Sequence, residues 1–202
     1  MTKTVTLALT GASGIPYGMR LLECLLAAQV RVYLLYSQAA QVVAKQEMDL
    51  TLPARTAEAE ALFCERYKAE PGQLRVFGRE EWFAPVASGS NPADAMVICP
   101  CTIGTLAAVA AGLSDNLIER AADVMLKERR TLVLVPRETP FSTIHLEAML
   151  KLAQAGAIIL PANPGFYHRP KSVAEVIDFI VARVLDQIGV EHDLIERWGE
   201  TK

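Results

Sequence analysis

The chain has 202 residues, 51% of them hydrophobic, which is enough to fill the core of one domain. Its formal net charge of -3 argues against a general nucleic-acid binder or a membrane-surface protein, and its apolar runs are too short to span a bilayer. Because the four cysteines lack the spacing of a disulfide framework and no signal-like segment begins the chain, we expect a reduced, cytoplasmic protein.

Short apolar segments alternate with longer amphipathic segments along the whole chain. We predict strands at residues 5–9, 32–36, 95–98, 132–135 and 157–160. We predict helices at residues 17–28, 39–46, 56–68, 102–111, 116–128, 141–155 and 173–188, with Ser37 and Ser172 as N-caps and Gly156 as a helix stop. This alternation predicts an α/β fold, a single doubly wound domain of the Rossmann or flavodoxin-like type, with helices on both faces of a mostly parallel sheet.

Residues 70–91 are the least regular part of the sequence, because they are polar and contain proline and glycine. We expect a short hairpin and a binding loop here, rather than a linker between domains. The prediction is therefore one domain over residues 1–202, in which residues 189–202 form a tail or lid.

A glycine-rich turn follows the first predicted strand and reads Thr10-Gly11-Ala12-Ser13-Gly14. Ligands of open parallel sheets bind outside the carboxyl ends of the strands. Glycines there let backbone N–H groups approach a phosphate or a ring, next to the positive end of the following helix. The spacing is not GxGxxG and no acidic residue ends the second strand, so a dinucleotide is disfavoured. A tight turn without a ligand is the alternative.

Three later strand ends also carry polar or unusual residues. The third strand ends in Cys99-Pro100-Cys101; without a second cysteine pair or a histidine cluster, buried thiols are favoured over a metal site. Arg137 and Glu138 follow the fourth strand, where charges are costly to bury without a function, and a surface ion pair is the alternative. Tyr167 lies in a proline-bounded loop after the last strand, either held in place for function or packed at a corner.

Several long motifs follow one another along nearly the entire chain: TGASG, ASGS at residues 87–90, CPC, NLIERAADVMLKERR, VPRETPFSTIHLEAM, PGFYHRP and RWGE. In these motifs the chain resembles the UbiX-type flavin prenyltransferases, which include the Pad-type proteins. The resemblance implies a homo-oligomer, a dodecamer in this family. It also implies metal-free transfer of a dimethylallyl group from dimethylallyl monophosphate to N5 and C6 of reduced FMN. The product, prenylated FMN, then serves a UbiD-type decarboxylase in ubiquinone biosynthesis or aromatic-acid decarboxylation.

The resemblance also implies roles for individual residues. The implied FMN contacts are Gly11, Ala12, Ser13, Ser37, Ser88, Gly89, Ser90, Thr102, Ile103, Gly104, Thr105 and Arg137. The implied contacts of dimethylallyl phosphate are Ser90, Lys127, Arg137, Tyr167, Arg183 and Glu47. The implied catalytic residues are Glu138 as acid/base group, Ser13 as proton relay, Lys127 as a cation and Trp198 as an aromatic that closes the pocket. The family's site lies between protomers, so these residues need not come from one chain. The chain departs from the family pattern at Thr102 and Arg183, where Ser and Lys are common.

The residue types suit this chemistry. Breaking the allylic C–O bond releases phosphate and a delocalised carbocation. Prenyl transferases that act on diphosphates hold magnesium with aspartate-rich motifs, and this sequence has no adjacent aspartate pair. Lys127, Arg183 and the other implied phosphate ligands can neutralise a monophosphate directly. Trp198 offers a ring face to the carbocation, and such a cation–π attraction is worth about 2 kcal/mol when desolvated. Anchoring of the C-terminal tail is an equally good explanation of this residue.

Two other functions compete with this one. A flavin-dependent cysteine decarboxylase of the phosphopantothenoylcysteine type carries a catalytic histidine and a signature with proline, methionine and asparagine, where this chain reads PANPGFYHRP. A non-catalytic FMN carrier explains the glycine turns but not the additional cations and Glu138. We therefore predict a flavin prenyltransferase that binds neither nucleic acid nor membrane.

Overall fold

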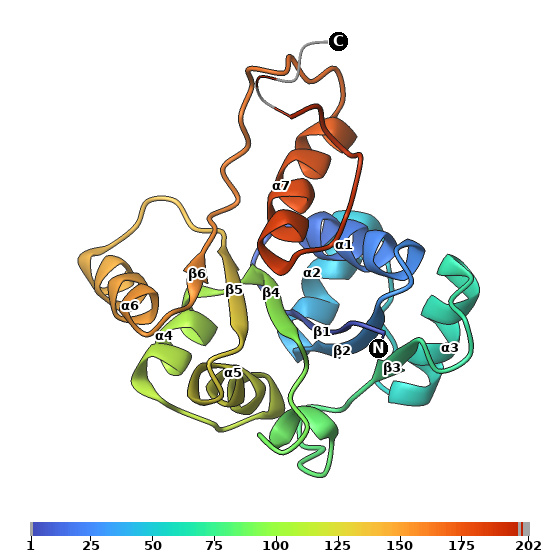
Figure 1. The fold of residues 1–202 in the computed structure, drawn as a ribbon, viewed down its shortest axis with the longest axis vertical. Helices are drawn as coiled ribbons and strands as arrows, with labels where there is room; N and C mark the ends of the chain where they lie inside the picture. Colours follow the sequence, from blue (N-terminus) through green and yellow to red (C-terminus); the bar gives the residue numbers. More distant parts are fainter. Residues whose placement is uncertain (1, 198, 200–202) are drawn as a thin grey trace.

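The computed structural model describes residues 2–197 and residue 199, and it contains a six-stranded sheet (Figure 1). The strands are β1 (Thr4–Leu9), β2 (Arg31–Tyr36), β3 (Leu74–Val76), β4 (Ala95–Cys101), β5 (Thr131–Pro136) and β6 (Ile158–Ile159). All pairings are parallel, and the order across the sheet is β3-β2-β1-β4-β5-β6. This order, which reverses between β1 and β4, is typical of doubly wound nucleotide-binding folds and confirms the predicted fold class.

Helices connect the strands and cover both faces of the sheet. They are α1 (Ile15–Ala27), α2 (Gln38–Met48), α3 (Thr56–Tyr67), the short 3-10 helix η1 (Pro85–Ala87), α4 (Ile103–Ala111), α5 (Leu117–Lys127), α6 (Thr143–Gln154) and α7 (Val173–Ile188). The predicted caps are confirmed, since Ser37 Oγ accepts the Ala40 N–H and Ser172 Oγ accepts the Glu175 N–H. None of these helices is long and apolar enough to cross a bilayer.

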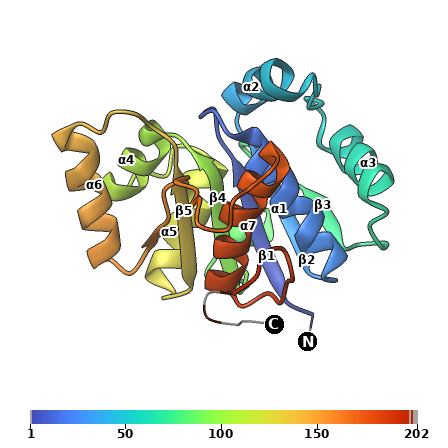
Figure 2. The same cartoon turned by 90° about the horizontal axis from the view of Figure 1, so that it is seen from above.

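Alternating side chains of the strands divide the core into two layers. In β1, Leu7 and Leu9 pack with α1 and α7, whereas Ala8 packs with α4, α5 and α6. Figure 2 shows α1 and α7 side by side over one face, and α4 and α6 side by side on the other. Because both faces are covered, the strands are apolar along almost their whole length, as the sequence predicted.

Gly18 allows α1 to lie directly against β4. A Cβ added at this position would be 2.3 Å from the Cys99 carbonyl oxygen and 2.4 Å from Leu9 Cδ2. The carbonyl belongs to a central strand and cannot shift, so Gly18→Ala is expected to destabilise the protein by about 2 kcal/mol, even though alanine favours the helix. Its melting temperature should fall by about 4 to 8 °C, and an unchanged value would contradict this account of Gly18.

The expected hairpin at residues 70–91 is wrong. The segment supplies one edge strand, β3, which pairs in parallel with β2. The chain then crosses to the other face of the sheet, because Phe77 and Val86 are buried in the layer that contains α5. Two hydrogen bonds fix this crossing: the Leu117 N–H donates to the Arg79 carbonyl at 2.8 Å, and Arg120 Nε donates to the Ala87 carbonyl at 2.9 Å. Residues 88–94 therefore reach the amino edge of the sheet, where β4 begins.

Candidate active site

The loops that follow β1 and β4 are joined by hydrogen bonds at the point where the strand order reverses. Thr10 Oγ1 donates to the Pro100 carbonyl at 2.8 Å and accepts the Thr102 N–H at 2.8 Å. Thr102 then caps α4, since its Oγ1 accepts the Thr105 N–H at 3.1 Å and lies 2.9 Å from Thr105 Oγ1. The two loops form one rigid, hydroxyl-rich surface at the carboxyl edge of the sheet.

A cavity of about 390 Å³ opens on this surface. It is lined by Thr10, Gly11, Ser37, Gln38, Ala39, Arg79, Thr102, Gly104, Thr105, Asn116, Ile118 and Glu119. The structure thus brings together five of the predicted FMN contacts, Gly11, Ser37, Thr102, Gly104 and Thr105. The helices α2 and α4 both begin at this cavity, so their positive ends face it.

The glycines at this edge have different physical roles. A Cβ at Gly11 would lie 2.3 Å from Ala39 Cβ, so Gly11 is required because α2 packs against the turn. Gly14 has a φ of +116° and precedes α1, a conformation that favours glycine. A Cβ at Gly104 would meet only Thr102 Oγ1, at 4.0 Å. Packing within the protein therefore does not require a glycine at position 104, and the missing side chain leaves open space in the cavity.

The side chain of Glu47, a residue of α2, reaches the start of α1 and accepts hydrogen bonds from the free backbone N–H groups there. Its Oε2 accepts the Gly14 N–H at 3.0 Å and the Ile15 N–H at 2.9 Å. The carboxylate therefore occupies the anion site that a helix N-terminus normally offers. Glu47 therefore satisfies the first N–H groups of α1, while Thr10 and Gly11 of the same turn line the cavity.

Arg137 and Glu138 lie at the same edge, directly after β5. Arg137 Nε donates to the Ser13 carbonyl at 3.4 Å, a long contact that connects the β5 loop to the β1 loop. Within the part of the chain that the structure describes, the half-buried Glu138 accepts a single hydrogen bond, from the Thr139 N–H at 3.2 Å. Among the described residues these two charges form no ion pair with each other or with a third residue, so the surface ion pair is excluded as an explanation.

Lys127 and residues Ser88, Gly89 and Ser90 lie together at the opposite, amino edge. Lys127 pairs with Glu128, and a Cβ at Gly89 would lie 2.6 Å from Lys127 Nζ. Lys127 precedes β5 and Arg137 follows it, so the length of this strand, about 20 Å, separates the two cations within one chain. The structure does not bring these predicted site residues together in a single protomer.

Tyr167 and Arg183 form a third group, beside β6 and α7. The Tyr167 ring packs edge-on against Phe179 with centroids 5.7 Å apart, and Arg183 follows Phe179 by one turn of α7. His168 stacks on the same Phe179 ring, and within the described chain neither of its buried ring nitrogens has a hydrogen-bond partner. Trp198, expected to close the pocket, lies outside the described residues.

The two cysteine thiols near the carboxyl edge of the sheet are unreactive. Cys99 and Cys101 are fully buried, and burial raises the pKa of the Cys101 thiol to about 12 and the pKa of Cys99 further. Both thiols are therefore protonated and poor nucleophiles. In the part of the chain that the structure describes, no three His, Cys, Asp or Glu side chains are grouped to hold a metal ion.

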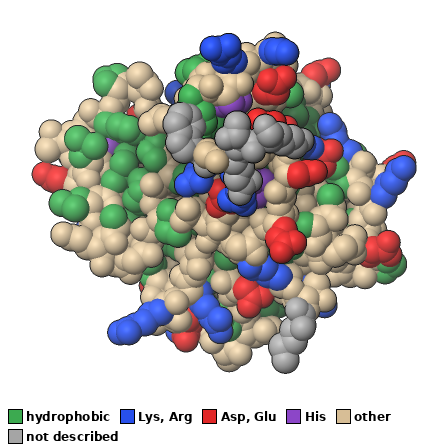
Figure 3. Space-filling model, turned by 45° about the horizontal axis from the view of Figure 1, so that its top comes forward, with side chains coloured by type: hydrophobic (Ala, Val, Ile, Leu, Met, Phe, Trp, Pro, Cys, Tyr) green, Lys and Arg blue, Asp and Glu red, His purple; other side chains and the backbone are tan. Residues whose placement is uncertain are grey.

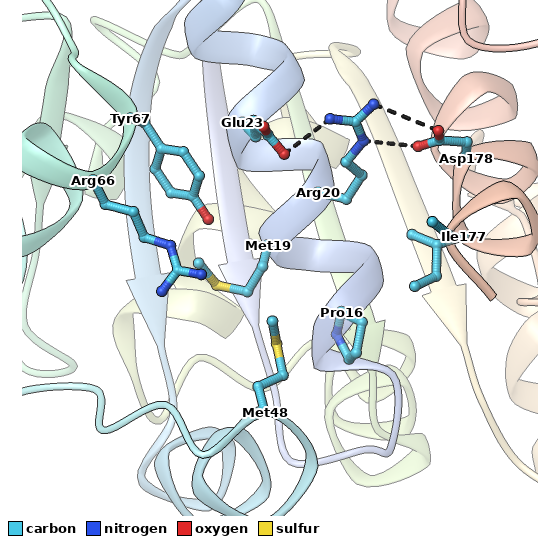
Figure 4. Close-up of a pocket in the computed structure, with 10 residues that line it drawn as sticks. Pro16, Met19, Arg20, Glu23, Met48, Arg66, Tyr67, Ile177 and Asp178 are labelled. Atoms are coloured by element: carbon cyan, nitrogen blue, oxygen red, sulfur yellow. Dashed lines mark hydrogen bonds and ion pairs between the residues drawn. The ribbon is translucent and has the colours of Figure 1, made fainter. Parts of the chain in front are cut away.

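A second cavity, of about 510 Å³, lies between α1, α3 and α7 and contains none of the predicted site residues (Figure 4). Met19, Met48 and Ile177 contribute its apolar lining. Arg20 crosses one side of it, with Nε 2.7 Å from Asp178 and Nη1 2.9 Å from Glu23. This partly buried pair fastens α7, which carries Arg183, to α1.

Residues 1–185 match the family model described as Flavoprotein. Together with the strand order and the cavity at the strand reversal, this match defines the chain as a flavoprotein. The chain is 59% identical to the flavin prenyltransferase UbiX of Pseudomonas aeruginosa, over 97% of this chain and 94% of that protein. It is 49% identical to the flavin prenyltransferase UbiX of Alkalihalophilus pseudofirmus, over 98% and 97% of the two chains. The chain belongs to the family of UbiX flavin prenyltransferases.

Solved structures agree with this assignment. A crystal structure of AnUbiX (PadA1) in complex with FMN and dimethylallyl pyrophosphate superposes with a TM-score of 0.88 and 40% identity, over all of both chains. A dodecameric FMN-dependent UbiX-like decarboxylase from Escherichia coli gives 0.85 and 39% identity, over 96% of this chain and 98% of that one. A PPC decarboxylase in complex with pantothenoylaminoethenethiol is only 16% identical, with a TM-score of 0.53, so the likeness to it concerns the fold alone.

Proposed function

We propose that this flavin prenyltransferase joins the dimethylallyl group of dimethylallyl monophosphate to N5 and C6 of reduced FMN. The observation that carries this proposal is the full-length likeness to AnUbiX, whose crystal structure holds FMN and dimethylallyl pyrophosphate. The product, prenylated FMN, is then passed to a UbiD-type decarboxylase. The four free cysteines suit a reducing compartment, the cytoplasm.

The carboxyl-edge cavity fits FMN in both size and chemistry. Its volume of about 390 Å³ lies within the usual range of cofactor sites. The hydroxyls of Ser37, Thr102 and Thr105 and the N-termini of α2 and α4 are the donors that a ribityl phosphate needs. Reduced FMN supplies the nucleophilic positions of the reaction, and the chain's residues bind and orient it.

Gly104→Ala should separate FMN binding from stability. The added Cβ enters the cavity without touching the protein, so FMN affinity is expected to fall at least about tenfold. Alanine is also the better residue within a helix, so the free energy of unfolding of the FMN-free protein should rise by about 0.5–1 kcal/mol. Flavin fluorescence titration and chemical unfolding measure the two quantities. Unchanged FMN affinity in a stable variant would remove Gly104 from the site.

The prenyl phosphate is assigned to Ser90, Lys127, Arg137, Tyr167 and Arg183. Fixed cations and the phenol hydroxyl give the departing phosphate charge-assisted donors, the role that magnesium has in many diphosphate enzymes. Glu47, whose carboxylate accepts the Gly14 N–H, is assigned to the wall of the prenyl pocket. Trp198, outside the described residues, is assigned to cover the carbocation.

A second copy of the chain is needed to complete this site. Lys127 and Ser90 lie about one strand length from Arg137 within a protomer, so a neighbour's amino edge must approach the carboxyl edge. Apolar side chains gather on the side of the molecule where α6 lies (Figure 3), and Ile144, Leu146 and Leu150 of α6 are exposed. Such a surface suits an interface between copies, and a dodecamer like that of the Escherichia coli relative is the assembly we propose.

Glu138 and Ser13 are assigned to proton transfer. Bond formation at N5 and C6 removes the protons of these two positions, and ring closure returns a proton to the double bond of the prenyl group. Within the described chain the Glu138 carboxylate accepts one hydrogen bond, from the Thr139 N–H, so it has lone pairs available to accept and return these protons. The Ser13 hydroxyl lies in the loop joined to Arg137 and relays the proton at N5.

The test is incubation of the protein with reduced FMN and dimethylallyl monophosphate under anaerobic conditions, followed by mass spectrometry of the released flavin. A flavin heavier by one isoprenyl unit supports the proposal. An unchanged flavin overturns it and favours an FMN carrier. Adding the product to a UbiD-type apo-decarboxylase then tests the recipient, because only prenylated FMN should restore its activity.

A further inference from the structure

The C-terminal segment of residues 190–197 folds back onto the end of α7. Gly189 ends the helix with a φ of 62°, and its carbonyl accepts a hydrogen bond from Lys3 Nζ at 2.9 Å. Val190 is buried, and Leu194 and Ile195 pack against the layer of α1 and α7. The segment is therefore docked, and its polar side chains have defined positions.

Asp186, in the last turn of α7, holds three of these side chains. Its Oδ2 lies 2.9 Å from Arg183 Nη1, and its Oδ1 lies 3.1 Å from His192 Nε2 and 3.2 Å from Arg197 Nη2. The carboxylate is 17% exposed and His192 is 6% exposed, whereas Arg183 and Arg197 are 49% and 54% exposed. Asp186 thus lies beneath two guanidinium groups that face solvent.

The charges in this cluster do not balance. The Leu194 N–H donates to His192 Nδ1 at 3.4 Å, and His192 Nε2 lies against Asp186, so the ring is held between the segment and α7. One carboxylate faces two guanidinium groups. Within the described residues each guanidinium donates one of its five N–H groups to Asp186, and its other donors have no partner there. Exposed ion pairs contribute only about 0–1 kcal/mol to stability, so stability alone does not explain two arginines on one carboxylate.

We propose that Arg197 is a further ligand of the prenyl phosphate, delivered by the C-terminal segment, and that Asp186 is the positioning residue that holds Arg197 beside Arg183. This inference rests on the proposed function, which assigns Arg183 to the phosphate. A phosphate monoester carries a charge of about -1.5 to -2 at neutral pH. Asp186 neutralises Arg183 alone, so Arg197 supplies the positive charge that remains to meet the phosphate. Arg197 thus brings one cation to the phosphate end of the site, on a segment that also carries Glu191, Asp193 and Glu196.

Calorimetric titration of dimethylallyl monophosphate into the full-length, FMN-loaded protein tests the role of Arg197. Arg197→Gln should raise the Kd about tenfold, the loss of one charge-assisted interaction, and Arg197→Lys should recover part of it. Arg55→Gln is the matched control, since Arg55 is an exposed arginine that pairs with Glu58 at i,i+3. Equal affinities for Arg197→Gln and Arg55→Gln would overturn the proposal.

Asp186→Asn tests the positioning role. It should raise the KM for dimethylallyl monophosphate and also lower kcat, because Arg183 loses its anchor, and Asp186→Glu should partly restore both. In the Arg197→Gln background the same change should have a smaller effect, because the two residues act through one contact. A melting temperature that falls without any change in KM would show Asp186 to be structural and contradict the assignment.

Inorganic phosphate separates this inference from the proposed function. If the wild-type protein binds phosphate but forms no prenylated flavin, the proposed function fails while the cluster can still be tested. Tighter phosphate binding by the wild type than by Arg197→Gln then supports the anion site, and equal binding overturns it.

Discussion

Replacing Glu138 by glutamine is expected to lower the rate of prenylated FMN formation by about 100- to 10,000-fold, the usual contribution of a positioned acid/base group. FMN and dimethylallyl monophosphate should still bind, since neither the cavity nor the cations change. The fold should also persist, because the only hydrogen bond of the Glu138 carboxylate in the described chain is from the Thr139 N–H at 3.2 Å. A glutamine carbonyl oxygen can accept that bond equally well.

Single-turnover mass spectrometry of the flavin measures this rate, with binding of both substrates checked in parallel. Glu81→Gln is a matched control, because Glu81 also accepts one nearby backbone N–H, from Gly78 at 3.0 Å, and is not among the residues that line the carboxyl-edge cavity. It should react at the wild-type rate. Wild-type turnover in Glu138→Gln would show that another group or water moves these protons.

The longer elements of the fold could be predicted from the sequence because their burial pattern is continuous. β1, β2 and β5 are apolar runs covered on both faces, and helix ends were marked by capping residues such as Ser37. β3 was missed because it has only three residues, Leu74–Val76, with Arg75 exposed between two buried side chains. So short an edge strand is defined by its pairing with β2, which no local pattern reveals.

The candidate site was predictable only in part, for a topological reason. Residues that directly follow parallel strands must meet at one edge, so Thr102 and Arg137 could be placed near Gly11 from the alternation alone. Arg79 lines the same cavity but was missed, because the crossing of residues 77–94 depends on burial against α5. For the same reason nothing in the sequence indicated that Ser90 lies at the amino edge. The glycine turn was predicted to approach FMN, and the sequence did not show that Gly11 also makes room for Ala39 or that Glu47 caps α1.

Two inactive variants should restore activity when they assemble together. Lys127→Ala and Arg137→Ala each remove a cation assigned to the phosphate, so each alone should lose at least about 100-fold in rate. The two residues lie beyond opposite ends of β5, so under the proposed assignment each site takes Arg137 from one protomer and Lys127 from another. In oligomers formed by equal co-expression, about one quarter of the sites should receive both native residues if the chains mix at random.

Co-expression of Lys127→Ala with Lys127→Gln is the control for mixing, since no combination of these chains contains a native Lys127 and no activity should return. Recovery of about a quarter of the wild-type rate in the first mixture, and none in the second, would mean that the reaction occurs between subunits. Absence of recovery in a verified mixed oligomer would mean that Lys127 and Arg137 serve the same chain or that one of them is not a phosphate ligand. Because the strand between them has a fixed length, the first of these explanations would require a rearrangement of β5 itself, which its pairing with β4 opposes.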